Sequence, residues 1–151
     1  MPLNLPEFII YEYTKKDFDK TFTEGRRVNF QSIENVPDCE LFQYDLTPLN
    51  FKPAPGNSDF EVIHLPITEV LELLAPESYE LDSFRWHRVR KQISQDNEIE
   101  YPWVYVTTDN RVALMDGRHR LVGMAKFKNM TEAPVQVESK YKEQILKHFG
   151  K

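Results

Sequence analysis

The chain has 151 residues, of which 40% are hydrophobic and 28% charged, with a formal net charge of −5; this is typical of one globular domain and excludes a largely disordered chain. No apolar run approaches the ~20 residues of a membrane helix and no signal-peptide pattern is present, so we expect a cytoplasmic protein with no membrane partner. The single cysteine, Cys39, excludes an internal disulfide and a cysteine-rich metal site, and the negative charge disfavours a broad nucleic-acid-binding face.

The first third of the chain alternates strand signals with turn signals. Residues 8–13 are rich in β-branched and aromatic side chains and predict a strand, followed by a short helix over residues 14–22 that Thr14 caps. Residues 25–27, Gly-Arg-Arg, predict an exposed turn, and the weak alternation of residues 41–46 predicts another strand.

Residues 47–59 contain Pro48, Pro53, Pro55 and Gly56, which favour neither a helix nor a strand ladder. We therefore expect a loop, with a lid or a partner-binding arm as its alternative roles. The loop divides the single domain into an N-terminal accessory segment, residues 1–59, and a core, residues 60–151.

Two amphipathic elements open this core. Residues 60–65 alternate as a strand, and Pro66 then suits the first turn of a helix whose apolar face carries Ile67, Val70, Leu71 and Leu74. Asp82 or Ser83 can cap the next helix, predicted over residues 84–95, in which Phe84, Trp86, Val89 and Ile93 are the expected core contacts.

The strongest signal follows a predicted hairpin. The apolar runs 103–106 and 112–115 flank an Asp/Asn turn, and Asp116-Gly117-Arg118-His119-Arg120 then leads into a helix that bears Leu121, Met124 and Phe127. A helix start favours anions through unpaired N–H groups and the helix dipole, glycine lets a ligand approach the backbone, and two arginines and a histidine add cationic donors. The motif therefore predicts an anion site; a solvated basic turn with a structural histidine is the alternative.

The chain closes with a strand over residues 134–137 and a helix that Ser139 caps and Gly150 ends. Tyr141, Ile145, Leu146 and Phe149 form its apolar stripe. This stripe predicts packing on the core, with an exposed dimer helix as the alternative, and the sequence does not fix the oligomeric state.

Asp-Gly-Arg-His-Arg after an apolar strand, followed by a helix and a Pro-Val-x-Val strand, resembles the ParB/sulfiredoxin superfamily over roughly residues 60–138. That superfamily also includes free-serine kinases and proteins linked to DNA modification. The resemblance implies an α+β fold, a small mixed sheet with flanking helices, in which the motif holds nucleotide phosphates and His119 and Arg120 are the matching phosphate-binding pair. It also implies that the helix before the hairpin faces this site, which makes Arg85 and Arg88 candidates; a solvated basic face is their alternative.

Two departures narrow the expected activity. Arg118 stands where sulfiredoxins have their catalytic cysteine, so sulfiredoxin activity is not expected. The Glu-Arg-Arg spelling of chromosome-partitioning ParB proteins is absent, as is room for their DNA-binding domain, so a partition protein is not expected either.

The first hypothesis is thus a protein that binds a nucleoside triphosphate or diphosphate through Gly117, Arg118, His119, Arg120, Arg85 and Arg88. Phosphoryl transfer would further need a magnesium ion and a base, for which Asp116, His119 and an upstream glutamate are the candidates, although Asp116 could equally fix the turn; no protein metal site is predicted. The second hypothesis is a DNA- or RNA-backbone-binding or nuclease-like accessory protein, and the third is a non-catalytic module that binds a protein partner.

Overall fold

The computed structural model describes residues 27–36, 48–55 and 59–151. The strand and helix predicted over residues 8–22, the strand predicted over residues 41–46, and Cys39 lie outside this part of the chain. Its strands are β1 (Arg27–Asn29), β2 (Asn50–Lys52), β3 (Phe60–Pro66), β4 (Glu80–Asp82), β5 (Glu98–Glu100), β6 (Trp103–Val106), β7 (Val112–Asp116) and β8 (Glu132–Glu138). Its α-helices are α3 (Ile67–Leu71), α4 (Ser83–Lys91), α5 (Arg118–Lys128) and α6 (Lys142–His148).

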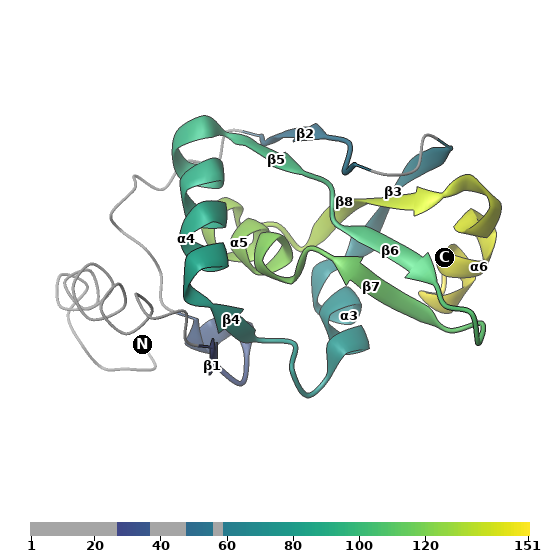
Figure 1. Ribbon diagram of the computed structural model, residues 1–151, viewed down its shortest axis with the longest axis horizontal. Coiled ribbons are helices and arrows are strands. Elements are labelled where there is room, and N and C mark those ends of the chain that lie inside the picture. The colour runs from purple at the N-terminus through teal and green to yellow at the C-terminus, as the bar shows by residue number, and fades with distance from the viewer. Residues whose placement is uncertain (1–26, 37–47, 56–58) are drawn as a thin grey trace, which may run out of the picture.

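A four-stranded mixed sheet in the order β3-β8-β6-β7 forms the centre of this α+β fold (Figure 1). The pairs β3–β8 and β6–β7 are antiparallel, whereas β6 and β8 are parallel. The predicted hairpin is confirmed as β6–β7, with Thr107 N–H donating to Arg111 C=O across the turn at 2.7 Å. The predicted strands over residues 60–65 and 134–137 are confirmed as parts of β3 and β8.

The helices pack their apolar faces against this sheet and against one another. Figure 1 shows α5 between α4 and α3, and contacts between these helices agree with that view. Trp86 of α4 is fully buried and stacks on Phe127 of α5, with ring centroids 5.5 Å apart. Other fully buried core side chains are Leu65, Ile67, Val70, Leu71, Leu81, Ile99, Val104, Leu121, Val122, Met124, Ala133, Val135, Val137 and Ile145.

Several helix boundaries differ from the sequence expectation. The helix predicted over residues 84–95 consists of α4 and a π-helical turn, Gln92–Asp96. Asn97, with φ 51°, ends this turn. Asp82 caps α4 by accepting a hydrogen bond from Arg85 N–H at 3.2 Å. Ser139 does not cap the last helix: it lies in a 3-10 turn, Ser139–Tyr141, that precedes α6.

The expectation that residues 47–59 form no ladder is wrong. β2 pairs in parallel with β5, and Phe51 stacks on Tyr101 with centroids 5.2 Å apart. Beyond β2, the buried Gln136 side chain accepts a hydrogen bond from Ala54 N–H at 2.9 Å and donates to Ala54 C=O at 3.4 Å. Residues 50–54 are therefore fastened to the core and do not form a free arm.

The expectation of a turn at residues 25–27 is also wrong for Arg27, whereas Gly25 and Arg26 lie outside the described residues. That residue begins β1, which pairs antiparallel with β4. Strands of the N-terminal segment thus pair with the strands on either side of α4, β4 before it and β5 after it. Across the described ranges, no helix is long and apolar enough to cross a membrane.

A basic cleft between α4 and α5

The predicted motif lies where β7 passes into α5, and Gly117 makes that turn. Gly117 has φ 122° and ψ 13° and accepts a hydrogen bond from Leu121 N–H at 2.8 Å, so it is the first residue of the helical ladder. A Cβ atom built on Gly117 would lie 2.7 Å from Pro102 Cβ and 2.9 Å from Pro102 Cα. Glycine is therefore required both by the backbone angle and by the close approach of Pro102.

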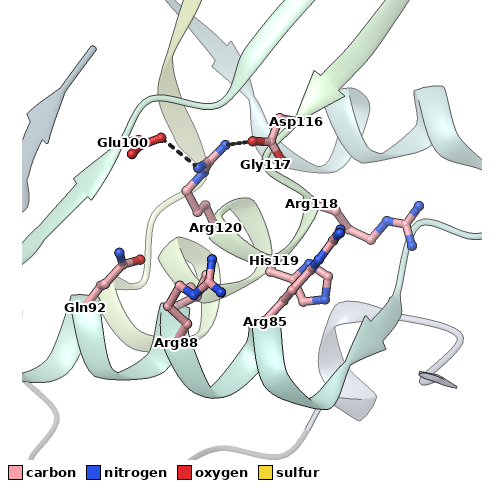
Figure 2. A pocket seen from close by; sticks show the side chains of 10 residues that line it. Arg85, Arg88, Gln92, Glu100, Asp116, Gly117, Arg118, His119 and Arg120 are labelled. Atoms are coloured by element: carbon pink, nitrogen blue, oxygen red, sulfur yellow. Dashed lines mark ion pairs between the residues drawn. The ribbon is translucent and has the colours of Figure 1, made fainter. Parts of the chain in front are cut away.

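The start of α5 and one face of α4 border a cleft of about 300 Å³. Figure 2 shows Arg85 and Arg88 of α4, and Gln92 of the π-helical turn that follows it, on one side of the cleft, with the motif on the other. The lining residues are Arg85, Arg88, Val89, Gln92, Glu100, Asp116, Gly117, Arg118, His119 and Arg120. The structure thus brings together every candidate residue that the sequence singled out, from segments about thirty residues apart along the chain.

Arg120 sits between two carboxylates. Its Nη2 lies 3.0 Å from Asp116 Oδ2, one helical turn before it, and its Nη1 lies 3.6 Å from Glu100 Oε2 (Figure 2). The side chain is only 12% exposed; its buried Nη2 contacts Asp116 as an ion pair, and its buried Nε has no hydrogen-bond partner in the described part of the chain. The guanidinium is therefore charge-compensated, yet it retains donor atoms that its partners do not satisfy.

Arg118 and His119 point to the opposite end of the cleft, toward β4. Arg118 Nη1 donates to Glu80 C=O at 3.1 Å. The His119 ring is 8% exposed, and its Nε2 accepts a hydrogen bond from Asp82 N–H at 2.8 Å. An accepting Nε2 carries no proton, so the imidazole in this structure is the neutral form protonated on Nδ1.

Arg85 and Arg88 are the exposed cations of the cleft. Neither side chain forms an ion pair or hydrogen bond with the residues that the structure describes, so both guanidinium groups keep their full donor capacity. Four arginines against two carboxylates leave the cleft with an excess of positive charge, although the whole chain is acidic. The cleft thus attracts anions locally where the protein as a whole does not.

A smaller hollow of about 120 Å³ adjoins the cleft on the far side of the motif. It shares Arg85, Asp116 and the three residues that follow Asp116, and its apolar wall consists of Leu74, Leu114 and Met115. Met115 is 51% exposed, which is unusual for a large apolar side chain.

Two other arginines of the described chain, which were not candidates for the site, do not line the cleft. Arg111 lies in the β6–β7 turn and pairs with Asp109, its Nε 2.8 Å from Oδ2. Arg90 is 3% exposed and lies outside the lining.

Glu100 is the lining residue that the sequence did not indicate. It is one acidic residue in a short strand, and only the fold brings it to Arg120. Gln92, by contrast, shares a helical face with Arg85 and Arg88, a spacing that the sequence shows directly.

The described residues include no cluster of three His, Cys, Asp or Glu side chains that could hold a metal ion. A scan against protein-family models and searches of curated proteins and of solved structures find no match to this chain. What the cleft binds must therefore be argued from its own geometry and charge.

Proposed function

We propose that the chain binds a nucleotide or another polyphosphate in the cleft between α4 and α5. The observation that carries this proposal is the convergence of four arginines on one cleft at the first turn of an eleven-residue helix. Guanidinium groups form forked hydrogen bonds with phosphate oxygens, and the N-terminal end of a helix adds the positive end of its dipole.

The balance of charge favours a ligand with more than one negative charge. Two of the four guanidinium charges are matched by Glu100 and Asp116, and the remainder suits a diphosphate or triphosphate better than a monoanion. A magnesium ion would arrive bound to such a ligand, since the described residues form no metal cluster of their own.

Arg120 and Arg118 should differ in their contribution to binding. Removing Arg120 deletes a donor with unsatisfied N–H groups and also leaves Asp116 and Glu100 as unpaired carboxylates facing the ligand. Arg118 already donates to Glu80 C=O, so part of its donor capacity is used within the protein. We expect Arg120→Ala to weaken affinity about tenfold or more, because a charged hydrogen bond contributes about 1.5–3 kcal/mol, and Arg118→Ala to cost less.

Calorimetry with inorganic tripolyphosphate and a panel of nucleoside triphosphates and diphosphates tests the proposal. Arg111→Ala is the matched control, since it removes an exposed arginine from the hairpin turn, outside the cleft. Equal small losses for all three variants would reduce the site to a solvated basic turn, and no binding by the parent protein would remove the proposal. Preferred binding of a single-stranded oligonucleotide, with a steep fall as salt is added, would indicate nucleic acid as the ligand.

Phosphoryl transfer is the chemistry that we propose to test next in this cleft. Asp116, the last residue of β7, is the more exposed of the two carboxylates in the cleft, with a side chain 65% exposed. It would orient an acceptor hydroxyl beside the bound phosphates. The expected result is that the terminal phosphoryl group of a nucleoside triphosphate passes to an added alcohol or to water, with release of the nucleoside diphosphate, and that Asp116→Asn abolishes this release. Binding without turnover would leave a binding protein.

A further inference from the structure

The first turn of α5 is joined to the segment that starts α4 by two side-chain hydrogen bonds. Arg118 Nη1 donates to Glu80 C=O at 3.1 Å, and His119 Nε2 accepts from Asp82 N–H at 2.8 Å. Glu80 and Asp82 are the two ends of β4, and Asp82 Oδ1 in turn caps α4 through Arg85 N–H. A chain of contacts therefore runs from the motif to the first turn of the helix that carries Arg85 and Arg88.

We infer that His119 is a positioning residue: it holds the start of α4 at a fixed distance from α5, and its Nε2 does not contact the bound phosphate. This inference rests on the proposed function, and it departs from the role that the resemblance implies for this histidine.

The hydrogen-bond chemistry of the imidazole supports this assignment. A lone pair on Nε2 that accepts from a backbone N–H leaves that nitrogen unable to donate to a phosphate oxygen. The ring is also 8% exposed, so a phosphate could reach Nε2 only by displacing the Asp82 amide. That displacement would leave a partly buried N–H without its partner, at a cost comparable to the new contact.

The position of α4 matters because α4 supplies the uncompensated charge of the cleft. Arg85 and Arg88 project from this helix toward the motif (Figure 2), whereas Arg120 is held by carboxylates on the other side. A ligand that contacts Arg85 and Arg88 as well as Arg120 requires a fixed distance between α4 and α5. His119 would therefore act on affinity through Arg85 and Arg88.

A double-mutant cycle separates this role from direct contact. His119→Ala should weaken binding of inorganic tripolyphosphate about fivefold in the parent protein, and should have almost no further effect in an Arg85→Ala/Arg88→Ala background. His119→Gln should restore most of the loss, because its Oε1 can accept from Asp82 N–H. The same loss in both backgrounds would show that His119 contacts the ligand and would overturn the inference.

Nitrogen-15 NMR of the unsubstituted protein supplies a test that does not depend on ligand binding. His119 should show an unprotonated Nε2 and a protonated Nδ1, with the Asp82 amide slow to exchange, and tripolyphosphate should leave this pattern unchanged. Hydrogen exchange at Asp82 should accelerate about tenfold or more in His119→Ala and stay slow in His119→Gln. A protonated Nε2, or an Asp82 amide that exchanges equally fast in both variants, would refute the inference even if no polyphosphate binds.

Discussion

Replacing Gly117 with alanine should destabilise the protein far more than replacing Gly150. At φ 122°, an L-residue at position 117 carries backbone strain of about 1–3 kcal/mol. The new Cβ would also meet Pro102 Cβ at 2.7 Å and Pro102 Cα at 2.9 Å, where the obstacle is a rigid ring and backbone. Overpacking of this kind adds about 1–3 kcal/mol, so we expect a loss of about 3 kcal/mol or more in the free energy of unfolding.

Gly150 provides the matched control because it shares the positive φ without the crowding. Its φ is 75°, and a Cβ there would meet nothing within 4 Å, so Gly150→Ala should cost about 1 kcal/mol. Urea unfolding followed by fluorescence of the buried Trp86 measures both variants. With a slope of about 2 kcal/mol per molar, Gly117→Ala should lower the midpoint by about 1.5 M. Equal stability of the two variants would refute the argument that Pro102 requires glycine at the motif.

Three further substitutions test other features of the structure. Glu100→Gln removes one negative charge from the cleft and should tighten tripolyphosphate binding about two- to fivefold by calorimetry; weaker binding would contradict the charge argument. Gln136→Leu leaves the Ala54 amide without its buried partner and should cost about 1–3 kcal/mol in urea unfolding, whereas an unchanged midpoint would show that the contact is dispensable. The hydroxyl of Thr107 hydrogen-bonds Asp109 and holds the pKa of that carboxyl below its ordinary value of 3.8. Ionised Asp109 therefore stabilises the folded state above pH 3.8, and this stabilisation is lost as the pH falls through the lower pKa of the folded state. Thr107→Val should raise the pKa of Asp109 in a carboxyl carbon-13 titration, and an unshifted midpoint would count against the hydrogen bond.

The sequence was sufficient for the elements whose side chains repeat at a regular period. The β6–β7 hairpin and α5 were predicted because two apolar runs flank an Asp/Asn turn and apolar residues then recur at Leu121, Met124 and Phe127, all of which are buried. Glycine at position 117 marked the change of period, and the structure has the strand-to-helix turn there. These signals lie within short stretches of the sequence, so they can be recognised without knowledge of the fold.

The parts that sequence reasoning missed depend on partners distant in the chain. Phe51 lies among prolines that argue against a strand, yet pairing with β5 and stacking on Tyr101 outweigh that local signal. Glu100 has no feature of its own that indicates a site, because its role arises from the approach of Arg120. The hydrogen bond that His119 accepts from Asp82 N–H has no sequence signal either, because it depends on where β4 lies; the phosphate-binding role that the motif implies for His119 stays a prediction.

The strand pairs that flank α4 have a consequence for how the protein opens. The strand pairs β1–β4 and β2–β5 each join segments about fifty residues apart in the sequence. Each pair therefore closes a large loop of chain, and each contains only three residue pairs. Closing loops of this length costs chain entropy for few strand pairs, so these pairs should form late in folding and open before the central sheet, even though Leu81 and Ile99 within them are fully buried. We therefore expect α4 and its two flanking strand pairs to behave as one cooperative unit that unfolds transiently while β3-β8-β6-β7 stays intact. Hydrogen exchange would reveal this opening as faster exchange of the amides of α4 and its flanking strands than of the central sheet. A ligand that bridges Arg88 and Arg120 would slow the exchange of α4 by stabilising the closed form.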